Sequence, residues 1–88
     1  MATSATGSQL AAHAYGAGKV IWIAGIQKIV RSLEEGLRRI YEYCLPLEVA
    51  RSRQAQGIGS GVNKLLIINK ENRLNRISLI FVRQKLGF

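Results

Sequence analysis

The apolar residues of this 88-residue chain gather in continuous runs, separated by polar and glycine-rich stretches. The run VIWIA at residues 20–24 is β-branched and aromatic and stops at Gly25, which predicts a strand buried on both faces. Strands of this kind lie mostly in parallel sheets that helices cover. Two later runs, at residues 65–68 and Ile77–Val82, predict further strands, and the short polar connection between them predicts a C-terminal β-hairpin.

The middle of the chain has the spacing of an amphipathic helix. Four apolar residues recur at helical intervals and form one stripe: Leu33, Leu37, Ile40 and Cys44. Ser32 and Glu35 have the spacing of a capping box, in which each side chain bonds the backbone amide of the other residue. Pro46 predicts a break or kink, followed by a second short helix over residues 47–56 and a glycine-rich turn at residues 57–61.

Ahead of the first strand, residues 6–15 predict a short helix, which the side-chain oxygen of Thr6 or Ser8 can cap. Residues 1–5 predict a disordered N-terminus. The elements together predict one α/β unit over residues 6–88, in which the amphipathic helix lies on a sheet.

Chain length and cysteine content limit how this unit is stabilised. A chain of this size buries only about 60–65 % of its unfolded surface, so its stability is expected to be marginal. Cys44 is the only cysteine, which excludes an internal disulfide and a multi-cysteine metal site and fits a reducing cytoplasm. We therefore expect a cytoplasmic protein with no metal and no cofactor. No apolar run reaches the ~20 residues that cross a bilayer.

The charge balance is strongly basic, with thirteen Lys and Arg against five Glu, no Asp and a net charge of +8. Such a chain attracts phosphates, nucleotides, nucleic acids and acidic protein surfaces. The basic residues are scattered along the sequence, so most of them are interpreted as solvated side chains. The lack of Asp excludes a Ser–His–Asp triad, and His13 has no second His, Cys or Asp near it in the sequence. The sequence shows no catalytic constellation.

Five short sequence motifs follow one another along the chain in an order that is characteristic of a known protein family. They are TGSQ at residues 6–9, GIQKIV at 25–30, LRRI at 37–40, PLEVAR at 46–51 and the closing IFV and LGF at 80–82 and 86–88. This order resembles the lactate-utilisation (LUD) domain family. The resemblance implies a Rossmann-like three-layer sandwich, similar to ribose phosphate isomerases and coenzyme A transferases, and a link to lactate utilisation or related carbon metabolism. In that family, some members belong to an iron–sulfur lactate-oxidising system.

Two departures from the family pattern modify what the resemblance implies. Many members carry a cysteine cluster where this chain has residues 57–61, so the chain resembles the cysteine-free branch. Complete domains of the family are longer and have further strands before the first helix seen here. The chain therefore resembles the C-terminal portion of such a domain.

The first functional hypothesis is binding of a small anionic metabolite or nucleotide. Thr6, Gly7 and Ser8 stand at a predicted helix N-terminus, where free amides attract anions. Gly25 and Lys28 follow the predicted strand at its carboxyl end, where open α/β sheets place their ligands. The plainer interpretation is that Thr6 to Ser8 only cap a helix and that Lys28 is a solvated lysine.

Two alternatives stay open. A small basic nucleic-acid-binding domain is disfavoured, because Trp22 and Phe81 belong to apolar strands rather than to a stacking platform. The other alternative is a non-functional truncated fragment or a partner-dependent interaction module. An incomplete sheet leaves an unpaired edge and an uncovered apolar face, so self-association or a partner chain is expected.

Overall fold

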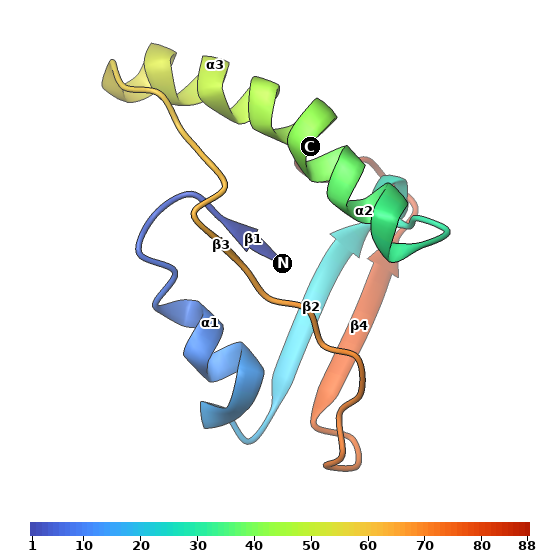
Figure 1. Cartoon of the computed structure of the whole chain (residues 1–88). Coiled ribbons are helices and arrows are strands. Elements are labelled where there is room, and N and C mark those ends of the chain that lie inside the picture. Colours follow the sequence, from blue (N-terminus) through green and yellow to red (C-terminus); the bar gives the residue numbers. More distant parts are fainter.

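Two parallel strands form the centre of the structure, a computed structural model that describes residues 1–88 (Figure 1). Strand β2 (Val20–Gly25) pairs in parallel with β4 (Ile77–Val82) over six residues, which confirms both predicted strands. A second, smaller sheet consists of β1 (Ala2–Thr3) and β3 (Lys64–Leu65), which run antiparallel. The chain is thus a small mixed α/β protein with two two-stranded sheets.

A long helical segment connects the strands and is continuous from Leu33 to Gln56 (Figure 1). It comprises α2 (Leu33–Arg39), the π-helical stretch η3 (Ile40–Cys44) and α3 (Leu45–Gln56). Of the break or kink expected at Pro46, the break does not occur, so that part of the prediction is wrong. Proline has no amide to donate, and the wider turn just before it lets the helix continue with Pro46 in the first turn of α3. No helix is long and apolar enough to span a membrane.

Local capping signals set where the helices begin and end. The Ser32 hydroxyl accepts a hydrogen bond from the Glu35 amide at 3.1 Å, which is one half of the predicted capping box. Helix α3 ends at Gly57, whose φ of 74° suits a residue without a Cβ. The predicted N-terminal helix exists as α1 (Gln9–Ala11) and the π-helical η1 (Ala12–Gly16), but Ser8 makes no side-chain cap there.

The expected C-terminal hairpin is also wrong. Strand β4 pairs with β2, and only Lys64–Leu65 of the preceding region form a strand, β3, which pairs with β1. The parallel arrangement aligns two apolar runs along their whole length, which a short hairpin with residues 65–68 would not do. The Met1 ammonium donates to the Leu66 carbonyl at 2.8 Å, so the N-terminal residues expected to be disordered are tied to the chain near β3.

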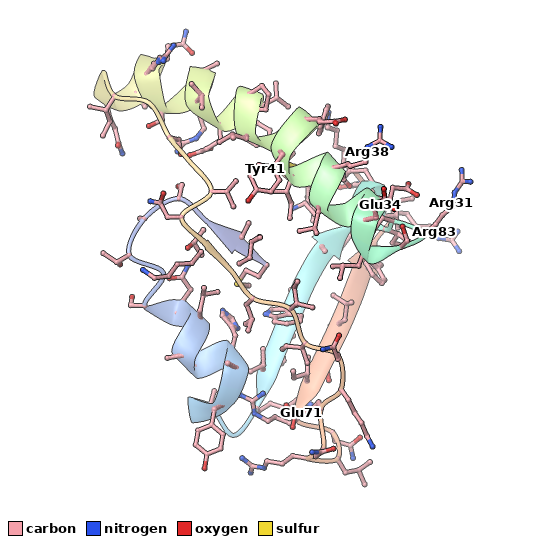
Figure 2. All side chains as sticks on the ribbon, in the orientation of Figure 1. Arg31, Glu34, Arg38, Tyr41, Glu71 and Arg83 are labelled. Carbon is pink, nitrogen blue, oxygen red and sulfur yellow. The ribbon has the colours of Figure 1, made fainter.

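One buried arginine joins the first helix to the parallel strands. Arg76 is only 3 % exposed, and its guanidinium donates to the carbonyls of Ala12, His13 and Ala17. His13 lies within η1 and Ala17 directly after it, and the Ala12 carbonyl also accepts from the Ala17 amide at 3.1 Å. The Glu71 carboxylate, near the lower end of the sheet in Figure 2, accepts a further bond from Arg76 at 2.9 Å.

The apolar core is very small. Val20 is the only buried hydrophobic side chain, so the prediction that residues 20–24 are buried on both faces is wrong. The physical reason is that two strands and one crossover helix provide too few layers to cover both sides of the sheet. The predicted helix stripe is half-buried at Leu37, Ile40 and Cys44 and exposed at Leu33.

Candidate interaction surface

One side of the parallel sheet forms an uncharged apolar surface, which we call the aliphatic face. Because side chains alternate along each strand and paired residues of parallel strands point the same way, its members follow from the register: Ile21, Ile23, Ser78, Ile80 and Val82. The isoleucines at positions 21, 23 and 80 are 58 %, 64 % and 50 % exposed. Large aliphatic side chains at neighbouring positions are therefore open to solvent together.

The opposite face of the sheet is partly covered. Val20 is buried there, and Trp22 donates its indole N–H to Nδ1 of His13 at 3.0 Å. The two rings lie 5.6 Å apart at a tilted angle, so η1 packs against β2 on this side. Leu79 and Phe81 of β4 remain about half exposed. The helix thus shields the β2 half of this face better than the β4 half.

Both strands of the pair have one unpaired edge, since the sheet contains only β2 and β4. Neither strand contains a proline or a charged residue, which are the usual protections against edge pairing. Lys19 borders the aliphatic face at its amino end, where its ammonium donates to the Asn75 carbonyl at 2.7 Å and to the Ser78 hydroxyl at 2.9 Å. The charge next to the face is therefore anchored at its border.

The whole chain exposes more surface than its mass requires. Its accessible area is 6616 Å², whereas a compact monomer of 9.7 kDa exposes ~5,100 Å². The radius of gyration is 14.1 Å, against about 12 Å for a compact domain of this length. The excess area indicates that part of the surface that a self-sufficient domain would bury is exposed in this chain.

The structure places Thr6, Gly7 and Ser8 in the turn between β1 and α1. The Thr6 carbonyl accepts a hydrogen bond from the Lys64 ammonium at 2.6 Å. Gly7 is buried with a φ of 71°, and a Cβ built there would lie 2.8 Å from the Thr3 hydroxyl and 3.0 Å from the Lys64 side chain. The chain itself therefore packs closely around Gly7.

Gly25 and Lys28 lie at the carboxyl end of β2, Lys28 as the last residue of the short 3₁₀ helix η2 (Ile26–Lys28). A Cβ on Gly25 would come within 2.6 Å of the Gln84 carbonyl and 2.7 Å of the Leu86 amide. The side-chain amide of Gln27 also donates, through Nε2, to the backbone carbonyl of Leu86 at 2.8 Å. The C-terminal segment therefore packs against Gly25 and Gln27 at the carboxyl end of β2. No hydrogen bond joins this group to Thr6, Gly7 or Ser8.

A cationic corner lies where β2 and β4 end and α2 begins. Figure 2 shows Arg31, Arg38 and Arg83 pointing outward there, beside Glu34. Arg38 pairs with Glu42 at 3.7 Å, whereas neither Arg31 nor Arg83 takes part in an ion pair. Sequence reasoning missed Arg83, because a hairpin would have carried the end of β4 away from the end of β2. The parallel register brings both ends to one edge.

A small cleft of about 220 Å³ separates the long helix from β1 and the C-terminus. Ile40 and Cys44 line it from the helix, opposite Thr3, Val62 and Phe88. The Cys44 thiol accepts a hydrogen bond from Arg39 at 2.9 Å. The predicted apolar stripe thus faces β1 and the chain terminus at these two positions. No three His, Cys, Asp or Glu side chains come together as metal ligands would.

Comparison with known proteins adds no relative, since no protein-family model, curated protein or solved structure matches the chain significantly. The resemblance to the LUD family therefore rests on the short motifs alone and stays a prediction. The exposed aliphatic face, by contrast, follows directly from the register and the burial of the strands.

Proposed function

We propose that this chain is a partner-dependent interaction module, which completes its fold by covering the aliphatic face with another protein surface. The observation that carries the proposal is that Ile21, Ile23 and Ile80 stand exposed together on a two-stranded parallel sheet. Parallel sheets occur almost only with both faces covered, and two isolated strands are marginal in water. The surface of a partner protein would cover the exposed face of the sheet, which this chain does not cover by itself.

The gain from covering these side chains is large relative to the stability of a small domain. Complete burial of one isoleucine stabilises by about 1.5–3 kcal/mol, and a core of this size contributes roughly 3–5 kcal/mol in total. Covering the aliphatic face therefore adds a contribution comparable to the whole internal core. Binding and ordering of the sheet are expected to be coupled.

The connection between the parallel strands supports a more specific architecture. Strand β2, the helical segment Leu33 to Gln56 and strand β4 form one β–α–β crossover, the repeating unit of Rossmann-like three-layer sandwiches. On this proposal the chain is part of such a sandwich, and the partner supplies the missing layer. The link to lactate utilisation belongs to the same proposal and is supported by the LUD-like motifs.

Hydrogen exchange and dye binding test the interaction module. The purified chain is expected to bind anilinonaphthalene sulfonate, which reports exposed apolar surface, unless its partner covers the face. At concentrations low enough for the chain to be monomeric, the backbone amide hydrogens of β2 and β4 are expected to exchange rapidly with solvent. A dye-free monomer with strongly protected amides in both strands would contradict the proposal.

The cationic corner supports a second candidate function, binding of a small anion. Arg31 and Arg83 of this corner are not in ion pairs, and neither is Lys28, which follows the carboxyl end of β2 as the last residue of η2. Titration calorimetry with inorganic phosphate, L-lactate and adenosine triphosphate would test this candidate directly. The substitution Arg83→Gln should weaken any binding, whereas Arg53→Gln on distant α3 should not. Absence of heat with all three probes would refute it.

A further inference from the structure

We infer that the aliphatic face is covered by the same face of a second copy of this chain, so that two copies form a symmetric dimer. The inference rests on the function proposed above and names the partner that it needs. It is carried by the composition of the face, by the excess surface of the chain and by the position of the charges around the face.

The composition of the aliphatic face makes it complementary to itself. In a twofold dimer each patch meets an identical patch, so any charge within the patch would oppose its own copy. The face contains three isoleucines, one valine and one serine, and none of them is charged. The serine hydroxyl already accepts a hydrogen bond from the Lys19 ammonium. The oxygen of the only polar side chain in the face therefore already has a donor within the same chain.

The excess surface is large enough for a stable interface. The chain exposes 6616 Å², about 1,500 Å² more than a compact monomer of its mass. A standard protein–protein interface buries ~800 Å² on each partner. Burial of one such interface would remove about half of this excess, so the whole chain exposes more surface than a single dimer contact requires.

None of the five side chains of the face is charged, and the Lys19 ammonium meets the face at Ser78. Lys19 borders the face at the amino end of the sheet, and Arg83 follows β4 at the other end. Repulsion between exposed charges of two copies is screened beyond about 8 Å at physiological ionic strength. A nucleic acid or an acidic surface would be attracted to the charges, but it would have to cover three isoleucines with polar groups that lose their water.

Sedimentation equilibrium of the full chain, over a roughly hundredfold range of concentration, tests the inference. The chain is expected to form a dimer, and Ile23→Lys or Ile80→Lys should each raise its Kd at least about tenfold, because each variant buries two ammonium groups in an apolar interface. Leu74→Lys is the matched control. Leu74 is 91 % exposed in the loop before β4, so the same change of charge there should leave the Kd unaltered.

An uncharged variant separates loss of the interface from loss of the fold. Ile23→Thr keeps a β-branched side chain, and it should also weaken the dimer while leaving the helical circular dichroism unchanged. Increasing salt should leave the dimer unchanged or tighten it, because screening removes only repulsion. A dimer that salt dissociates, or that Ile23→Lys and Ile80→Lys leave intact, would overturn the inference.

The inference and the proposed function fail in different ways. A monomer at every concentration that still binds anilinonaphthalene sulfonate would exclude a second copy as the partner but would retain the need for another protein. A monomer with protected strand amides and no dye binding would overturn both. Tight binding of a DNA or RNA oligonucleotide to a dye-exposing monomer would also exclude the symmetric dimer.

Discussion

At the scale of single residues, Arg76 accounts for much of the long-range connection in the structure. Its guanidinium donates to three carbonyls in and just after η1 and to the Glu71 carboxylate, and its backbone carbonyl accepts from the Val20 amide at 2.7 Å. The planar guanidinium can satisfy several acceptors at once, which the ammonium of lysine cannot do. This buried charge therefore has a structural role that composition alone did not suggest.

Replacement of Arg76 by lysine tests that role. We expect Arg76→Lys to lower the free energy of unfolding by about 1–3 kcal/mol, because at least one of these part-buried carbonyls loses its donor. Urea unfolding followed by fluorescence of Trp22, the single tryptophan, measures the change. Arg73→Lys is the control, since Arg73 makes no side-chain hydrogen bond and should unfold as the parent does. Equal stability of Arg76→Lys and the parent would contradict the role.

The carboxyl of Glu71 makes the same region sensitive to acid. The Arg73 amide donates to it at 2.9 Å and, together with Arg76, holds the pKa of Glu71 below its usual value of 4.5. A lowered pKa in the folded state stabilises the fold above pH 4.5, and this contribution is lost as the pH falls through the folded value. Glu71→Gln should flatten this part of the stability profile. Urea unfolding of both proteins between neutral and acidic pH would measure the difference.

At the scale of elements, capping residues set the two ends of the long helix, and the missing amide hydrogen of a proline sets its shape in the middle. Ser32 starts it with a hydroxyl that accepts from an amide, and Gly57 ends it in a left-handed conformation. Pro46 interrupts the α-helical hydrogen bonds, and η3 absorbs the interruption as a wider turn. The helical segment therefore continues through the proline to Gln56.

The end of this helix can be tested with two matched glycines. A Cβ at Gly57 or at Gly18 would contact nothing within 4 Å, but only Gly57 has a positive φ. We expect Gly57→Ala to destabilise by about 1 kcal/mol, because the left-handed conformation is strained for residues with a Cβ. Gly18→Ala should be neutral or stabilising by about 0.4–1 kcal/mol. Thermal unfolding of both variants measures the two changes in stability. Equal changes in the two variants would contradict the prediction.

At the scale of the whole molecule, the main feature is the large share of apolar surface that no other part of the chain covers. Only Val20 forms a buried apolar core, the molecule extends 42 Å along its longest axis, and three of its thirteen basic residues are in ion pairs. Such a chain has little internal stabilisation to offset its conformational entropy. Association is therefore expected to stabilise the fold as well as to carry the proposed function.

Coupling between association and stability predicts a melting temperature that depends on concentration. We expect the Tm of the parent chain to rise with protein concentration, because only the folded chain presents the aliphatic face to a second copy. The Tm of Ile23→Lys should stay constant over the same range. Differential scanning calorimetry at several concentrations gives both values. A parent Tm that does not move would contradict the coupling.

The sequence by itself determined the features that depend on near neighbours. Strands β2 and β4, the start of the long helix at Ser32 and its end at Gly57 follow from apolar runs, one hydroxyl and one flexible backbone position. Each is set by residues within a few positions of one another, so periodicity and capping rules suffice. The prediction of an uncovered apolar face also came from length and pattern, because too few elements were present to cover it.

Only the tertiary structure decided which strands pair and what fills the space beside them. The parallel pairing of β2 and β4, the burial of Arg76 and the packing of residues 84–86 against Gly25 all join segments more than fifty residues apart. Such contacts compete with every alternative pairing of the same apolar runs, and their outcome depends on chain closure and on the fit of whole surfaces. That is the physical reason why the hairpin was predicted wrongly and why Arg83 was missed at the carboxyl edge.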